Sequence, residues 1–195
     1  MNYLGHAYLS FGQTDLLLGN MIGDYVKGNL SKSPYTSAVQ KGIDLHRKID
    51  SFTDTHTATL RAKICFRADY GLYAGPIMDT LYDHFLANDP MIFKSQQDLN
   101  EFAQNTYKTL ATVADSFPEP FAKLFPYMQQ QNWLLGYRAI KGMENALHGL
   151  SRRAQHMPEP SLAYQIFVSN YYLLNQCYFE LIEDLIKFVK IELNK

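Results

Sequence analysis

The sequence predicts an all-α fold, a single-domain helical bundle over residues 1–195. Apolar side chains recur at spacings of three and four through most of the chain, which is the period of an amphipathic helix. Alternating apolar and polar runs bounded by hairpin turns, the signature of strands, are absent. A chain of this length fits one domain and buries enough surface to fold without a metal or disulfide.

Four helices are predicted in the first 90 residues. Residues 14–22 carry a polar start and an apolar run. Ser33-Pro34 predicts the start of a long helix that ends near Thr55, because serine accepts from free amides and proline suits the first turn. The other two cover residues 57–70, before a glycine, and 76–87, before an Asn-Asp-Pro stop signal.

The second half of the chain continues the helical pattern. Ser95 and Asp98 match a capping box ahead of a helix that reaches about Val113. The remaining predicted helices cover residues 118–131, 132–153 and, after a Met-Pro-Glu-Pro linker, 161–193.

Composition excludes several classes of protein. Lys and Arg number 18 against 19 Asp and Glu, a balance that argues against a protein that coats nucleic acid. Cys65 and Cys177 lack metal or redox spacing and predict reduced thiols in a cytoplasmic protein. The N-terminal residues do not resemble a signal peptide, and no apolar run reaches the ~18 residues of a membrane span.

The predicted helix at 33–55 carries ionisable residues on its apolar stripe. The stripe begins at Val39 and Ile43 and continues to His46, Asp50 and Asp54. Ionisable groups on a core-facing stripe are costly unless they pair, hydrogen-bond or bind a metal. His46 and Asp50, four apart, reach one ion from successive turns; the alternative is a His–Asp hydrogen bond at a helix contact.

Other candidates interrupt apolar segments elsewhere. Asp79, Asp83 and His84 lie in the predicted helix at 76–87, where the alternative is a solvated face beside a half-buried histidine. Asp24 ends an apolar run punctuated by glycines. His6 stands in an apolar opening, where a lone histidine is more often part of the core.

Imidazole and carboxylate ligands together suit Mn, Fe, Zn or Mg. Such a metal lowers the pKa of bound water and neutralises charge at phosphorus. Lys27, Arg47 and Lys48 lie close enough in sequence to hold phosphate groups, although ordinary surface charge explains Lys48 better.

Four ordered motifs resemble the acyl carrier protein phosphodiesterase family. They are residues 2–6 (NYLGH), 19–29 (GNMIGDYVKGN), 42–54 (GIDLHRKIDSFTD) and 83–86 (DHFL), with 133–138 (WLLGYR) and 151–153 (SRR) fitting the same family. The resemblance implies a helical fold distantly related to HD-domain phosphohydrolases. It implies a hydrolase that uses Mn²⁺, or another divalent ion such as Mg²⁺ or Fe²⁺, to remove 4′-phosphopantetheine from holo acyl carrier protein.

The resemblance also implies roles for particular residues. Metal ligation falls to Asp24, His46, Asp50 and Asp83, with His6, Asp54 and His84 as second candidates. Phosphate neutralisation falls to Lys27 or Arg47, and protonation of the departing serine to His6 or His84. The order Asp83-His84 reverses the His-Asp doublet of HD proteins, so their ligand positions do not transfer directly.

Two other functions remain open from the sequence. One is an HD-like phosphohydrolase of a nucleotide or small phosphate ester; the other is a helical interaction module whose His and Asp residues are structural. An acidic carrier protein as partner predicts a basic surface near the site. Its candidates are Lys41, Arg47, Lys48, Arg61, Lys63 and Arg67, extended by Arg138, Arg152 and Arg153.

Overall fold

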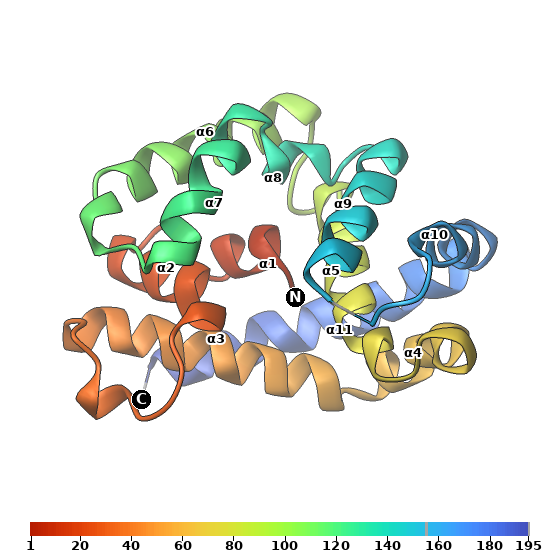
Figure 1. The fold of residues 1–195 in the computed structure, drawn as a ribbon, viewed down its shortest axis with the longest axis horizontal. Coiled ribbons are helices and arrows are strands. Elements are labelled where there is room, and N and C mark those ends of the chain that lie inside the picture. Colours follow the sequence, from red (N-terminus) through yellow and green to blue (C-terminus); the bar gives the residue numbers. More distant parts are fainter. Residues whose placement is uncertain (155, 195) are drawn as a thin grey trace.

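A computed structural model describes residues 1–154 and 156–194, and over these residues all regular structure is helical (Figure 1). The predicted all-α fold class is confirmed. The α-helices are α1 (Tyr3–Tyr8), α2 (Thr14–Ile22), α3 (Ser37–Thr55), α4 (Thr57–Tyr70), α5 (Ala74–Ala87), α6 (Gln96–Ala111), α7 (Glu119–Gln130), α8 (Trp133–Gly136), α9 (Ile140–Arg153), α10 (Pro160–Ser169) and α11 (Tyr171–Leu193).

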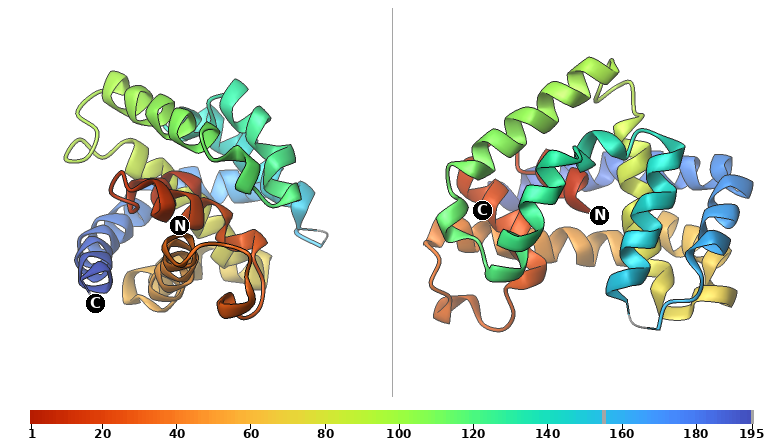
Figure 2. Two further views of the ribbon diagram at one scale, coloured as in Figure 1. Left: turned by 90° about the vertical axis from the view of Figure 1, so that its left-hand side faces the viewer. Right: turned by 45° about the horizontal axis from the view of Figure 1, so that its top comes forward.

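The helices surround the short helix α1. In Figure 1, α3 and α11 run along one side, and α6, α7 and α8 arch over the opposite side. Helix α5 passes between these two groups of helices and packs against α4, α9 and α1 (Figure 2). Residues Tyr3–Ala7 of α1 are buried, so polar side chains on α1 face the interior.

Helices α2 and α3 cross at very short range because glycines meet there. A Cβ on Gly19 would lie 2.3 Å from the Val39 carbonyl oxygen, and one on Gly42 would lie 2.7 Å from the Leu16 carbonyl oxygen. Only residues without a side chain permit this approach. The crossing brings the carboxyl end of α2 over the middle of α3.

Several predicted helix ends differ from the structure. Helix α3 begins at Ser37, where Thr36 caps it by accepting from the Val39 amide at 3.4 Å. Ser33 is instead extended, because the following proline disfavours the helical conformation, and it ends a 3₁₀ turn over Leu30–Lys32. The capping box is confirmed: Ser95 Oγ accepts from the Asp98 amide at 3.1 Å.

Two predicted long helices are each divided. The segment at 132–153 contains α8 and α9, which separate where Gly142 packs so closely on the Gly136 carbonyl that a Cβ would lie 2.0 Å from its oxygen. The last segment breaks between α10 and α11 at Asn170. No helix in the described ranges is long and apolar enough to cross a membrane.

Candidate metal centre

Two histidines and one aspartate meet where α1 lies against α3. Asp50 Oδ1 lies 3.1 Å from His6 Nε2, and its Oδ2 lies 3.1 Å from His46 Nε2. The two imidazole rings stack with their centroids 3.9 Å apart. One ligand atom from each of these residues lies within 4.8 Å of the other two, which is close enough for a shared ion.

Asp24 completes the cluster from a 3₁₀ turn over Gly23–Tyr25, directly after α2. Its Oδ1 lies 3.4 Å from His46 Nε2, and the residue is exposed. Gly23 makes this approach possible, because a Cβ there would lie 2.3 Å from His46 Cγ. The tight crossing of α2 and α3 therefore places a solvent-facing carboxylate beside a buried histidine.

The backbone fixes how His46 presents its ring nitrogens. Nδ1 lies 2.7 Å from the Asn20 carbonyl oxygen and donates its proton there. The Nε2 lone pair then faces the carboxylates of Asp24 and Asp50. A lone pair facing two anions requires a cation between them, either a proton or a metal ion.

The pKa values of His46, His6 and Asp50 are shifted by burial and by their mutual contacts. Burial disfavours an imidazolium at His46, but hydrogen bonds and charge from Asp24 and Asp50 outweigh it and raise its pKa to about 9. Burial and the neighbouring His46 lower the pKa of His6 to about 4. Burial opposes ionisation of Asp50, yet its two histidine hydrogen bonds hold its pKa well below the usual range.

The residues present fit a divalent metal. Two imidazole nitrogens and two carboxylates form a mixed nitrogen and oxygen set without cysteine, which suits Mn²⁺, Fe²⁺ or Zn²⁺. Within residues 1–154 and 156–194, His6 Nδ1 is buried with no hydrogen-bond partner, so the polar contact of the ring is through Nε2 toward the cluster. His6, His46, Asp50 and Asp24 could therefore hold such an ion.

Comparison with known proteins matches the sequence of this chain to a family. The sequence profile described as acyl carrier protein phosphodiesterase covers residues 1–185. The chain belongs to the acyl carrier protein phosphodiesterase family. The predicted resemblance is thus confirmed, and the family is one of hydrolases, as the sequence predicted.

Curated relatives carry the same name. The acyl carrier protein phosphodiesterase of Photorhabdus laumondii is 30% identical over 171 residues, which span 88% of this chain and 86% of the relative. That of Yersinia pestis is 30% identical over 185 residues, 95% of this chain and 91% of the relative. That of Salmonella paratyphi A is 31% identical over 153 residues, 78% and 79% of the two chains. No solved structure matches.

Within this acyl carrier protein phosphodiesterase family member, Asp83 lies apart from the cluster. Its carboxylate is fully buried and accepts from the backbone amides of Asn2 at 3.1 Å, Leu4 at 2.7 Å and Gly5 at 3.1 Å. Asp83 thus holds the start of α1. Of the four ligands that the resemblance implied, the structure brings together three, and His6, a second candidate, joins them.

His84 and Asp79 also have partners outside the His/Asp cluster. His84 Nδ1 donates to the Tyr137 carbonyl oxygen at 2.7 Å, and its Nε2 lies 3.0 Å from the Tyr171 hydroxyl. Asp79 lies 2.6 Å from the Met1 amino group, which is 3.6 Å from Asp50.

The two cations predicted to bind phosphate, Lys27 and Arg47, have different environments in the structure. Arg47 donates to the carbonyl oxygens of Val26 at 2.8 Å and Gly28 at 3.2 Å, so it anchors the loop that follows Asp24. Lys27 is exposed on that same loop.

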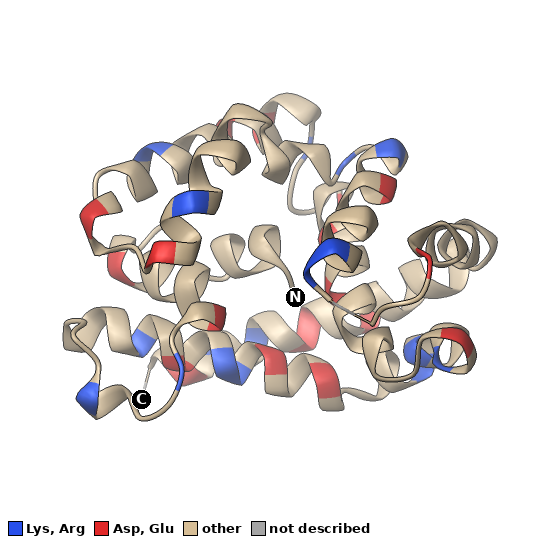
Figure 3. Ribbon diagram, viewed as in Figure 1, with Lys and Arg blue, Asp and Glu red and all other residues tan. Residues whose placement is uncertain are grey.

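Three of the nine cations named for the predicted basic surface pair with carboxylates, so this surface is less basic than predicted. Lys48 pairs with Asp44 and Glu192, Arg61 with Glu180, and Lys63 with Asp54 at 2.5 Å. Asp54 therefore faces Lys63 and not the His/Asp cluster. Figure 3 shows the resulting mixture of both charges along α3.

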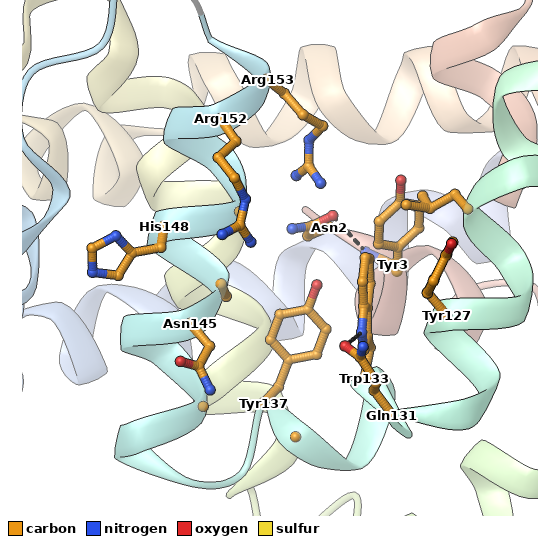
Figure 4. A pocket seen from close by; sticks show the side chains of 15 residues that line it. Asn2, Tyr3, Tyr127, Gln131, Trp133, Tyr137, Asn145, His148, Arg152 and Arg153 are labelled. Atoms are coloured by element: carbon orange, nitrogen blue, oxygen red, sulfur yellow. Dashed lines mark hydrogen bonds between the residues drawn. The ribbon is translucent and has the colours of Figure 1, made fainter.

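A cavity that the sequence did not reveal opens beside Asn2 and Tyr3, at the start of α1 (Figure 4). Its volume is about 840 Å³, and α7, α8, α9 and residues 2–3 form its walls. Tyr3 lines the cavity, and its hydroxyl lies 2.7 Å from that of Tyr25, the residue after Asp24. The motifs at 133–138 and 151–153 could have indicated this cavity, but they are far apart in the sequence, and nothing in the sequence shows that they line the same cavity.

Proposed function

We propose that this chain is a metal-dependent phosphodiester hydrolase that removes 4′-phosphopantetheine from holo acyl carrier protein. The meeting of His6, His46 and Asp50, with Asp24 at the solvent side, is the observation that carries the proposal. The names of the relatives supply the substrate. Mixed nitrogen and oxygen ligation is compatible with Mn²⁺, the ion that the family resemblance implies.

When bound, a divalent ion would acidify water and neutralise charge on the phosphate. The residues of the chain prepare that site. Asp50 holds both imidazoles through its two oxygens, and the Asn20 carbonyl keeps the His46 Nε2 lone pair turned inward. Asp24, exposed beside Nε2, is the carboxylate positioned at the entrance for water and substrate.

The proposed reaction is the hydrolysis of the phosphodiester that joins the arm to the carrier's serine. A water oxygen forms a bond to phosphorus, and the bond between phosphorus and the carrier's serine oxygen breaks. One water proton ends on the serine oxygen, which regenerates the free hydroxyl of the apo carrier. The other product is 4′-phosphopantetheine.

Intact-mass analysis of holo carrier protein tests the proposal. Incubation with the chain and Mn²⁺ is expected to remove the mass of the phosphopantetheine arm, and chelator is expected to stop the loss. Asp50→Ala is expected to abolish turnover, whereas Asp44→Ala on the same helix, outside the cluster, serves as the matched control. Turnover of nucleotides without turnover of carrier would instead support the alternative small-ester hydrolase.

A further inference from the structure

The cavity lies next to the first residues of the chain, and these residues also contact the proposed metal centre. Asn2 and Tyr3 line the cavity, while the Met1 amino group before them lies 3.6 Å from Asp50 Oδ1. The Tyr3 hydroxyl meets that of Tyr25 at 2.7 Å on the side of Asp24. The end of the cavity at Asn2 and Tyr3 is therefore the end linked to the cluster, through Met1 and Tyr25, and the rest of the cavity extends between α7 and α9.

Two arginines at the end of α9 supply positive charge to this space. Figure 4 shows the guanidinium groups of Arg152 and Arg153 directed into the cavity, with Arg153 above Asn2. Neither side chain forms an ion pair with a residue in 1–154 or 156–194, unlike Arg61, which pairs with Glu180. Paired guanidinium forks without carboxylate partners suit the oxygens of a phosphate.

Aromatic and amide groups continue the lining away from the arginines. Tyr137 is only 5% exposed, yet its hydroxyl faces the cavity and makes no hydrogen bond with a described residue (Figure 4). Trp133 stands opposite, with its Nε1 donating to Gln131 Oε1 at 2.9 Å, and Asn145 lies across from it on α9. Such a lining suits an uncharged chain that has both methyl groups and amides.

Small residues keep the α9 wall open. Gly142, Ala146 and Gly149 line the cavity and, at spacings of four and three, share one face of the helix with Arg153. Among the described residues, a Cβ added to Gly149 would meet only Arg152 Nη2, at 3.9 Å. The space beside Gly149 is therefore available to a ligand or to an introduced side chain.

We propose that this cavity binds the 4′-phosphopantetheine arm, with Arg152 and Arg153 on its phosphate and Tyr137 and Trp133 along its pantetheine chain. The proposal rests on the proposed function and assigns the specificity-determining residues of the same site. Tyr137 donates its free hydroxyl proton to an acceptor on the arm. The arm enters between α7 and α9 and presents its phosphodiester beside Tyr3, toward the cluster.

Calorimetric titration with 4′-phosphopantetheine and with unphosphorylated pantetheine, in the presence of Mn²⁺, tests the assignment. The double variant Arg152→Gln, Arg153→Gln is expected to weaken 4′-phosphopantetheine binding at least about tenfold and to leave pantetheine binding unchanged. Gly149→Leu fills the cavity and is expected to weaken both ligands. Arg67→Gln, an exposed arginine on α4, is the matched control and binds both as the wild type does.

Wild-type affinity in the double arginine variant, or in a folded Gly149→Leu variant, would overturn the assignment. The arginine variant changes only exposed side chains, so its result stands even if Gly149→Leu does not fold. Binding is measured at equilibrium and without the carrier. If the wild type hydrolyses the carrier but the variants bind both ligands as the wild type does, only the assignment of the cavity is refuted. If the variants show the expected binding pattern but the wild type does not hydrolyse the carrier, only the proposed function is refuted.

Discussion

A methyl group added at Gly23 tests the proposed metal centre without removing any of the residues proposed to hold the ion. The new Cβ in Gly23→Ala would lie 2.3 Å from His46 Cγ and 2.5 Å from Cδ2. Carbon atoms in contact prefer about 3.5–4.0 Å, so the imidazole must move by roughly 1 Å or more. The backbone at this position has φ −53° and ψ −39°, which alanine adopts freely. The backbone conformation at position 23 is therefore preserved, and the nearest atoms that must move belong to His46, whose Cβ would also lie 2.7 Å from the new methyl group.

The expected effect on activity exceeds the effect on stability. Moving the ring breaks its 2.7 Å hydrogen bond to Asn20 and misplaces Nε2. A displacement of about 1 Å in a catalytic group costs roughly 100-fold in rate. Overpacking costs about 1–3 kcal/mol, which lowers Tm by roughly 2–12 °C for a domain of this size.

The assay compares Mn²⁺-dependent release of apo carrier with thermal unfolding for the same variant. Gly75→Ala is the matched control, because nothing lies closer than 3.7 Å to its added Cβ. Wild-type kcat/KM and Mn²⁺ affinity in Gly23→Ala would refute the assignment of His46 to the metal centre.

Three further predictions address the cap, the buried histidine and the exposed loop. Ser95→Ala removes the cap of α6 and is expected to lower the free energy of unfolding by about 1 kcal/mol in denaturant titrations, with unchanged turnover. Burial lowers the pKa of His84 below its unfolded value. The neutral ring therefore contributes to stability above pH ~6.5, and this contribution is lost as the pH falls through the folded pKa. On acidification, the Tm of His84→Gln is expected to fall less than that of the wild type. Lys27→Glu is expected to raise KM for the carrier and flatten the dependence of kcat/KM on ionic strength, whereas a fall in kcat would instead place Lys27 on the reacting phosphate.

The sequence predicted the parts of the site that depend on helical period. His46 and Asp50 interrupt an apolar stripe, and that pattern survives in α3. His6 could be only a second candidate, because α1 spans six residues and is too short to show a period. Asp83 interrupts a stripe in the same way as Asp50, yet it caps the amides of α1, a partner 78 or more positions away.

The local sequence pattern could not predict the ion pairs of the basic residues or the cavity. Glu180 and Glu192, which neutralise Arg61 and Lys48, come from α11 at the other end of the chain. The cavity exists because the chain breaks between α8 and α9 and turns Tyr137 inward. The break arises from a glycine contact between neighbouring helices, and a continuous helical pattern conceals it.

Mn²⁺ binding by the metal-free chain tests the central claim most directly. Calorimetry is expected to show one Mn²⁺ bound by the wild type and none by Asp50→Ala, because Asp50 joins both histidines. Thermal unfolding of the metal-free chain is expected to remain cooperative, since the core does not depend on the ion. Wild-type Mn²⁺ stoichiometry and affinity in Asp50→Ala would contradict the account.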